Sequence, residues 1–245
     1  MPKPGDNTTQ EGERMSKAQR KQEAMARRGA SRRFIVALVL GVLVLVGVLI
    51  AAVNVGGGGG QPGPASDPRL AALASEHAAT LGDPGAKVHI VEFLDPACET
   101  CALFYPLVKS WMEEVPGQIR LSIRHLPFHE GVDYVVRILE ASRNQDKYWE
   151  TLETLLARQR EWVSNHVVQP ERVLPTLAGL GLDMEQLQAD MNSAEVQQRM
   201  DKDFQDSKVL KVVATPEYFV NGRPLPSFGQ QQLLDLVREE LGKHY

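Results

Sequence analysis

Cysteine is nearly absent from this chain, since Cys98 and Cys101 are the only two among 245 residues. Two cysteines exclude a fold held together by several disulfides. A bridge between them would close a loop of only four residues and would remove at most about 2 kcal/mol of entropy from the unfolded chain. A purely stabilising disulfide is therefore the weaker interpretation, and a single close pair predicts a redox site.

A strong excess of charge is absent as well. The formal net charge is −4, and no basic patch along the sequence indicates a nucleic-acid partner. The charge is nevertheless unevenly distributed: residues 1–33 carry nine basic and four acidic side chains, whereas residues 34–245 carry 18 and 27. The N-terminal segment therefore differs in kind from the rest of the chain.

Polar side chains are missing from residues 34–53, an apolar run of 20 residues. At about 1.5 Å of rise per residue, a helix of this length spans about 30 Å, the thickness of a bilayer's hydrocarbon core. A cleaved signal peptide is the alternative, but its apolar region is usually about 7–15 residues long. We therefore predict an uncleaved anchor over 34–55 in a bacterial inner (cytoplasmic) membrane. The basic tail 1–33 then lies in the cytoplasm and the C-terminal domain in the periplasm or otherwise outside the cytoplasm.

The remaining sequence indicates a linker, residues 56–68, and one domain, residues 69–245. β-Branched and aromatic runs predict strands, and helical spacing of apolar residues predicts helices. The expected strands are 87–94, 119–126, 217–220 and 223–225. The expected helices are 70–81, 98–115, 132–144, 148–160, 171–178, 183–191, 193–204 and 230–241. The order strand, helix, strand around residue 100 predicts an α/β fold with a parallel strand pair.

Two shorter patterns add detail to this expectation. Apolar and polar residues alternate from Ile119 to Arg124, which predicts a strand with one buried face. Asn221-Gly222 lies between the last two expected strands and predicts a tight type I′ hairpin turn.

The two cysteines lie where an expected strand ends and an expected helix begins. Cys98 falls at the start of that helix, where unpaired N–H groups and the helix dipole favour an anion, so its thiolate should form readily. Cys101 lies one turn further along, on the same side of the helix. We therefore expect Cys98 to be the nucleophile and Cys101 to be the thiol that resolves a mixed disulfide.

Metal binding is an alternative use of the same residues. With His125 and His129 the cysteines form a C-x2-C…H-x3-H string, although the two halves are further apart than in a usual zinc finger. Copper suits the dithiol better than zinc, because thiolates bind Cu(I) well. A membrane-anchored copper-binding chaperone is therefore the second functional hypothesis.

Two sequence signatures resemble the DsbA-like branch of the thioredoxin-fold oxidoreductases. The first is the segment 91–101, VEFLDPACETC, followed by Pro106, and the second is the segment 213–222, VATPEYFVNG. The long helical stretch between them, about 130–209, is similar to the helical insertion of that branch. The resemblance implies a thioredoxin-like α/β fold with this insertion and a thiol–disulfide oxidoreductase that needs no bound cofactor and no metal.

The resemblance also implies roles for individual residues. It makes Cys98 and Cys101 the catalytic pair, and it makes Thr215–Pro216 a cis peptide beside them, where the Thr215 backbone binds an extended substrate. Glu92 matches a buried acid that exchanges a proton with the second cysteine during the reaction. The implied partners are exported proteins with thiols or disulfides and a separate redox partner in the envelope.

The dipeptide between the cysteines, Glu99-Thr100, differs from the Pro-His that the oxidase DsbA carries at this place, where the histidine helps to stabilise the thiolate. A like charge about 7 Å from the thiolate in water costs about 0.6 kcal/mol, less than half a pKa unit. The charge of Glu99, together with the missing histidine, predicts a weaker oxidant than DsbA. The sequence therefore leaves oxidation and reduction or isomerisation of substrates as alternatives.

Overall fold

The computed structural model describes residues 67–74 and 76–245. The chain divides into two units, 1–61 and 62–245, and every described residue belongs to the second. The expected cytoplasmic tail and membrane anchor, together with most of the expected linker, lie outside the described residues. Within the described part, no helix has the length and apolar character needed to cross a membrane.

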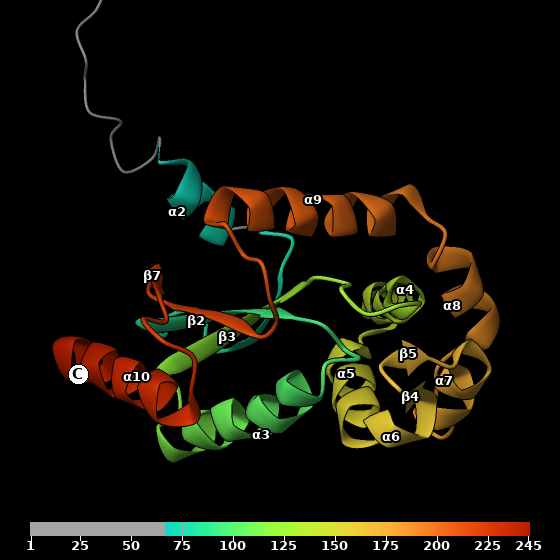
Figure 1. Ribbon diagram of the computed structural model, residues 1–245, viewed down its shortest axis with the longest axis horizontal. Coiled ribbons are helices and arrows are strands. Elements are labelled where there is room, and N and C mark those ends of the chain that lie inside the picture. The colour runs from blue at the N-terminus through green and yellow to red at the C-terminus, as the bar shows by residue number, and fades with distance from the viewer. Residues whose placement is uncertain (1–66, 75) are drawn as a thin grey trace, which may run out of the picture. The chain divides into compact units, whose positions relative to one another are not determined.

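A five-stranded mixed sheet forms the centre of the domain, with the strand order β1-β3-β2-β6-β7 (Figure 1). β2 and β3 are parallel, as expected, and the other neighbouring pairs are antiparallel. Both Asn221 and Gly222 have positive φ, 48° and 80°, which confirms the predicted turn between β6 and β7. The strands are β1 (Ala79–Gly82), β2 (Val88–Leu94), β3 (Ile119–His125), β6 (Glu217–Val220) and β7 (Arg223–Pro224).

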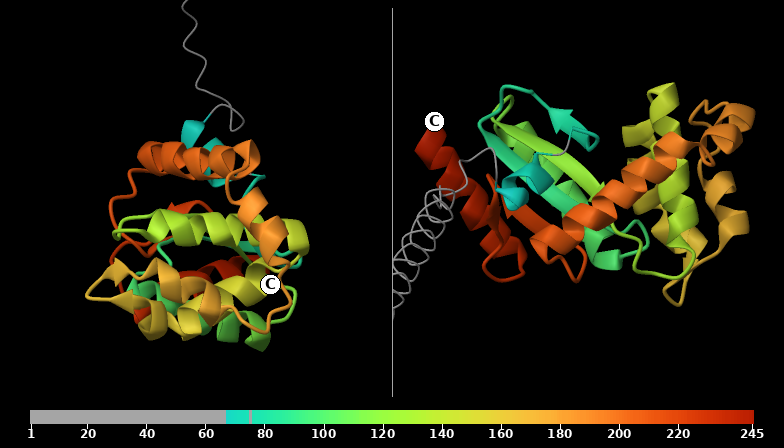
Figure 2. Two further views of the ribbon diagram at one scale, coloured as in Figure 1. Left: turned by 90° about the vertical axis from the view of Figure 1, so that its right-hand side faces the viewer. Right: turned by 90° about the horizontal axis from the view of Figure 1, so that it is seen from above.

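Helices cover both faces of this sheet (Figures 1 and 2). One face packs against α3 (Glu99–Glu114) and α10 (Gln230–His244), and its cluster includes Ile90 from β2. The other face packs against α2 (Pro68–Leu73) and α9 (Ala194–Leu210), and its cluster includes Phe93. Because strand side chains alternate between faces, Glu92 lies on the same face as Ile90, the face covered by α3.

A helical insertion separates β3 from α9, as Figure 1 shows. Helices lie near the predicted ranges 132–144, 171–178 and 183–191, whereas the predicted helix 148–160 is interrupted at Arg158 and the predicted insertion, about 130–209, included α9, which packs on the sheet. The sequence analysis also missed a small antiparallel hairpin, β4 and β5. Two-residue strands are too short for an alternating pattern to stand out. The insertion consists of α4 (Val132–Ser142), the 3-10 helix η2 (Arg143–Gln145), α5 (Tyr148–Ala157), α6 (Gln159–Trp162), β4 (Val163–Ser164), β5 (Val167–Val168), α7 (Pro170–Thr176) and α8 (Met184–Asp190).

The expected helix over 70–81 is wrong in its second half. Helix α2 ends at Leu73, and Ala79–Gly82 forms the edge strand β1, which pairs antiparallel with β3. Gly82 has φ +99°, and a Cβ there would lie 2.7 Å from the carbonyl oxygen of Ile119. Pairing with β3, a tertiary contact, therefore overrides the local helical pattern.

The expectation of one buried face on β3 is also wrong. Ser122 and Arg124 are buried, and the Arg124 side chain is fully enclosed. Its guanidinium bonds the carboxylates of Asp203 and Asp206 on α9, the second at 2.6 Å, and the carbonyl oxygen of Ala72 at 2.9 Å. Asp203 also accepts the backbone N–H of His125 at 2.7 Å. This network attaches β3 to α9 and α2.

We expect Arg124→Met to lower the free energy of unfolding by about 3–5 kcal/mol, because it leaves two buried carboxylates without the guanidinium. Arg120→Met is the matched control on the same strand, since Arg120 is only partly buried and its Nε has no hydrogen-bond partner among the described residues. Its effect should stay within about 0.5 kcal/mol. Urea unfolding measures both variants, and equal losses would contradict a role for the Arg124 network.

Candidate active site

A short turn carries the dithiol from the end of β2 to the start of α3. Cys98 is the N-cap residue of α3, with extended φ and ψ of −77° and 119°. The Asp95 carboxylate accepts the N–H of Ala97 at 2.7 Å, and the Asp95 carbonyl accepts that of Cys98 at 3.0 Å. An Asp before a proline favours such a turn, so the sequence Asp-Pro-Ala itself places Cys98 at the helix start.

Cys98 is largely buried but has an unusually acidic thiol. The residue is 8% exposed and forms no disulfide, and Sγ lies 3.4 Å from the carbonyl oxygen of Thr215. A hydrogen bond from the Cys101 thiol is the main cause that lowers the pKa of Cys98 to about 6, and the N–H groups of Cys101 and Thr100 add to it. Burial acts in the opposite direction. Cys98 therefore holds a thiolate at neutral pH, as expected for a helix N-terminus.

Cys101 has the opposite character. Its side chain is fully buried, and this burial raises the pKa of its thiol far above the ordinary value. The hydrogen bond to Cys98 and the negative charge of Glu92 act in the same direction. One thiol of the pair is thus ionised and retains a small exposed fraction, while the other is protonated and fully enclosed.

Glu92 is fully buried on β2, the position that the resemblance implies for this acid. Burial raises the pKa of its carboxyl to about 8, and the charge of Cys98 acts in the same direction. Tyr218 on β6 lies directly across from Glu92 in the sheet and lowers this pKa somewhat. Neither the Glu92 oxygens nor the Tyr218 hydroxyl form a hydrogen bond of normal geometry with the described residues.

The second signature faces the dithiol. The Thr215–Pro216 peptide bond is cis, and the Thr215 carbonyl oxygen lies 3.4 Å from Cys98 Sγ, where it accepts a hydrogen bond only while that thiol is protonated. The structure therefore brings together all five residues that the sequence analysis singled out, from β2, from the start of α3 and from the segment before β6.

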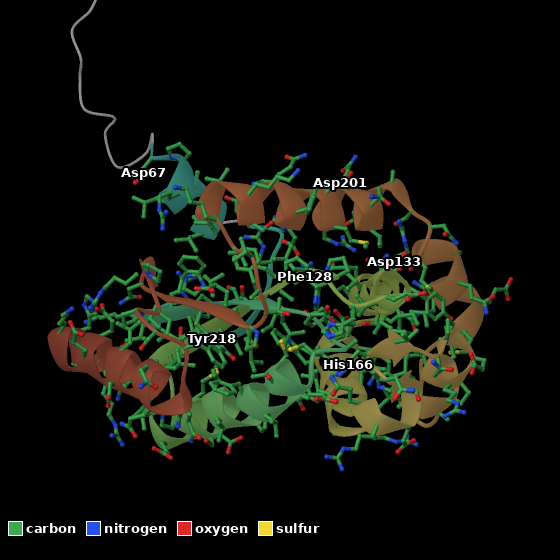
Figure 3. The ribbon with its side chains drawn as sticks, in the orientation of Figure 1. Asp67, Phe128, Asp133, His166, Asp201 and Tyr218 are labelled. Atoms are coloured by element: carbon green, nitrogen blue, oxygen red, sulfur yellow. The ribbon has the colours of Figure 1, made fainter. Side chains whose placement is uncertain are left out.

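Three further residues of the site were missed by the sequence analysis: Asp95, Gln159 and Tyr218. Asp95 accepts N–H groups of Phe128 and His129 at 2.8 and 2.9 Å besides that of Ala97. Its place before Pro96 could have indicated a residue that shapes the turn. The sequence around Tyr218 and Gln159 gives no such indication, because the residues they contact come from distant parts of the chain. Figure 3 shows Tyr218 on β6, Phe128 in the loop after β3 and His166 in the β4–β5 turn.

The two histidines of the proposed zinc string do not join the cysteines. His125 Nε2 is buried against the Tyr148 hydroxyl at 2.8 Å, and His129 Nδ1 lies 2.8 Å from the Asp95 carboxylate. Among the described residues, no three His, Cys, Asp or Glu side chains come together as a ligand set for a metal ion. A four-ligand zinc site at this string is therefore not supported.

Comparison with curated proteins finds relatives of two kinds. A stretch of 147 residues is 32% identical to the Na(+)/H(+) antiporter NhaA of Herminiimonas arsenicoxydans, covering 59% of this chain and 22% of that protein. The chain thus spans about a fifth of the length of this relative. A stretch of 155 residues is 27% identical to the probable disulfide bond formation protein D of Bacillus anthracis, covering 58% of this chain and 69% of that protein.

Solved structures give the same fold. A thioredoxin-like oxidoreductase from Silicibacter pomeroyi is 29% identical with a TM-score of 0.61, covering 71% of this chain and 98% of that one. The Wolbachia pipientis protein alpha-DsbA1 has a TM-score of 0.62 at 16% identity, covering 72% of this chain and 96% of that one, and it shares the fold. These structures agree with the predicted DsbA-like fold, and the first of them is named an oxidoreductase.

A family model described as Thioredoxin matches residues 74–237. The match includes the turn with both cysteines, the helical insertion and the Thr215–Pro216 segment. The chain therefore belongs to the thioredoxin family, and its fold is of the DsbA-like type.

Proposed function

We propose that this protein is a thiol–disulfide oxidoreductase of the bacterial envelope that exchanges disulfides with exported proteins. The observation that carries the proposal is the unequal ionisation of the two thiols. Cys98 has a pKa lowered to about 6, and the Cys101 thiol is buried with a raised pKa. The thiolate is the attacking species in disulfide exchange, so this difference assigns a role to each cysteine.

The reaction begins when the Cys98 thiolate attacks a sulfur of a substrate disulfide. A mixed disulfide forms, and the second substrate sulfur leaves as a thiolate. Cys101 then loses its proton and attacks Cys98 Sγ, which releases the first substrate sulfur. The substrate gains two electrons, and the enzyme keeps a Cys98–Cys101 disulfide. Oxidation of a substrate dithiol is the same sequence in reverse, and no bound cofactor is required.

Glu92 is the proton acceptor for Cys101 in this scheme when its carboxyl is ionised, which at a pKa of about 8 holds for roughly one molecule in ten at pH 7. A buried carboxylate with a pKa of about 8 exchanges protons with a thiol more readily than an exposed carboxylate would, because the affinities of the two groups for the proton are closer. The charge of Glu92 is among the causes that raise the pKa of Cys101, so the two groups interact.

Substrate binding involves the Thr215 backbone and apolar side chains around the dithiol. Thr215 faces Cys98 through its carbonyl oxygen, where an extended peptide can pair with the backbone. Leu103, Phe128 and Val213 are exposed by 68%, 52% and 84%. Leu103 follows Cys101 on α3, and Val213 precedes Thr215. Exposed apolar side chains beside a reactive thiol suit unfolded exported chains.

The location proposed from the sequence is a single-pass anchor over 34–55, with the tail 1–33 in the cytoplasm and the domain outside it. The membrane itself and an envelope redox partner, which resets the dithiol after each turnover, are then the other contacts of the protein. The apolar run of 20 residues and its basic flank support this arrangement.

Copper binding by the same thiols remains the second hypothesis, and the site favours it less. Cu(I) needs both sulfurs as thiolates, and burial raises the pKa of Cys101 far above its usual value. Titration of the reduced protein with Cu(I) separates the two functions, because tight stoichiometric binding without dithiol turnover supports a chaperone.

We expect Cys98→Ser to abolish insulin reduction and refolding of reduced ribonuclease, because no thiolate remains to attack. Cys101→Ser should keep the attacking thiolate and accumulate mixed disulfides, because nothing resolves them. Non-reducing gel electrophoresis with mass spectrometry measures the trapped species. Wild-type activity in Cys98→Ser would overturn the assignment of the nucleophile.

Glu92→Gln should slow release of the mixed disulfide by about 100-fold, because it removes the proton acceptor. The attack of Cys98, followed by stopped-flow formation of the mixed disulfide, should stay fast. Equal slowing of both steps would indicate a general packing defect rather than proton transfer.

Glu92 should also make folding stability depend on pH. Its folded-state pKa of about 8 lies above the ordinary 4.5, so the native state holds a proton that the unfolded state has released between these values. The free energy of unfolding therefore falls as pH rises from about 4.5 to 8, by no more than about 5 kcal/mol. Comparing Cys98→Ser with Cys98→Ser/Glu92→Gln isolates this slope, because Cys98 titrates in the opposite sense. Parallel pH profiles would contradict a raised Glu92 pKa.

The direction of exchange follows from the redox potential. A thiolate with a lowered pKa stabilises the reduced form, which makes the disulfide a stronger oxidant. We therefore expect a potential less negative than the about −270 mV of thioredoxin. Equilibration with glutathione measures it, and a value at or below that of thioredoxin would favour a reductase.

A further inference from the structure

The turn that carries Cys98 is bonded to the helical insertion through one buried side chain, Gln159. Gln159 lies at the start of α6 and is 6% exposed. Its Nε2 donates to the carbonyl oxygen of Pro96 at 2.8 Å and to that of Cys98 at 3.1 Å. Both neighbours are carbonyl acceptors, so the amide must present its NH2 group to the turn.

These two bonds span the place where the chain changes from turn to helix. The Cys98 carbonyl already accepts the first helical N–H of α3, that of Ala102, at 3.2 Å. Gln159 adds a second donor to that oxygen and satisfies the buried Pro96 carbonyl as well. The positions of both peptide planes are therefore fixed by a residue that belongs to neither β2 nor α3.

The orientation of this first helical turn determines how Cys98 Sγ is solvated. The N–H groups of Thr100 and Cys101 and the Cys101 thiol all act on Sγ to lower the pKa of Cys98. Thr100 and Cys101 come directly after these two peptide planes in the chain, so the planes that Gln159 bonds set the direction of their donor groups. A small rotation of the turn would misalign these donors, and hydrogen bonds weaken steeply with misalignment.

The opposite side of the turn is held by Asp95. Its carboxylate bonds the N–H of Ala97 within the turn and those of Phe128 and His129 in the loop that leads into the insertion. The two attachments reach different parts of the insertion: Asp95 bonds the loop before α4, and Gln159 comes from α6. Asp95 is part of the turn and cannot be changed without altering it. Gln159 is outside the turn, so its contribution can be tested separately.

We propose that Gln159 is a positioning residue for Cys98, through which the helical insertion sets the reactivity of the dithiol. The residue does not touch the substrate or the sulfur atoms. It acts through the Pro96 and Cys98 carbonyls, which it holds in the orientation that directs the first N–H groups of α3 at Sγ. This inference rests on the proposed function for its biological meaning, since it concerns the same nucleophile.

The test compares Gln159→Met with Gln145→Met in the full-length protein. Met has nearly the length of Gln and removes both donors. Gln145 is a matched control in the same insertion, because its amide makes two hydrogen bonds to the Asp183 backbone, with Nε2–O and N–Oε1 distances of 3.0 and 2.8 Å, and does not bond the turn. The readouts are the pH profile of Cys98 alkylation by iodoacetamide and the glutathione redox equilibrium.

We expect Gln159→Met to move the midpoint of the alkylation profile upward by about one pH unit. The thiolate fraction at pH 6 then falls from about one half to about one tenth, and alkylation at that pH slows about five-fold. The redox equilibrium should shift towards the disulfide form. Gln145→Met should leave both readouts at their wild-type values, even if it lowers the unfolding midpoint as much as Gln159→Met does.

An alkylation profile of Gln159→Met that coincides with that of the wild type would overturn the inference. Equal shifts in both variants would also overturn it, because they would reflect general loosening of the insertion. If Gln159→Met does not fold, Gln159→Asn withdraws the amide by one methylene and gives the same comparison. Alkylation requires no turnover, so a wild-type protein that fails to reduce insulin would contradict the proposed function and still leave the role of Gln159 measurable.

Discussion

The interaction of the first turn of α3 with Cys98 Sγ is the one on which the rest of the site depends. The N–H groups and the Cys101 thiol of this turn lower the pKa of Cys98 to about 6 although burial acts against ionisation. The same geometry places the Cys101 thiol behind Cys98 as a donor, and burial keeps that thiol protonated. One helix N-terminus therefore produces two thiols of the same chemical type with different roles.

Buried polar groups have hydrogen-bond partners on one face of the sheet and lack them, among the described residues, on the other. On the face covered by α2 and α9, the Arg124 guanidinium is enclosed but has three acceptors. On the face covered by α3, Glu92 and the Tyr218 hydroxyl are enclosed without a hydrogen bond of normal geometry to the described residues. A buried polar group without a partner costs about 1–3 kcal/mol. The first arrangement holds the fold together, whereas the second keeps a carboxyl with a raised pKa beside the dithiol.

The insertion contributes to the site as well as to the core. Gln159 reaches the carbonyls of the turn, and His166 of the β4–β5 turn stacks on His129 with ring centroids 5.9 Å apart. His129 in turn bonds Asp95. The turn that carries Cys98 is therefore bonded to parts of the chain 33 to 63 residues away. Its geometry depends on how the insertion packs against the sheet.

The sequence by itself determined the local features of this protein. The cysteine pair, the breaker Asp95-Pro96 before it and the hairpin turn at Asn221-Gly222 depend on neighbouring residues, and each could be predicted. Tertiary structure alone decided that Ala79–Gly82 pairs with β3, that α9 covers Arg124, and that Tyr218 lies across from Glu92. It also decided that Gln159 reaches the turn that carries Cys98. The reason is physical: local patterns record backbone preference and periodicity, whereas burial and hydrogen bonding between distant segments depend on how the elements pack.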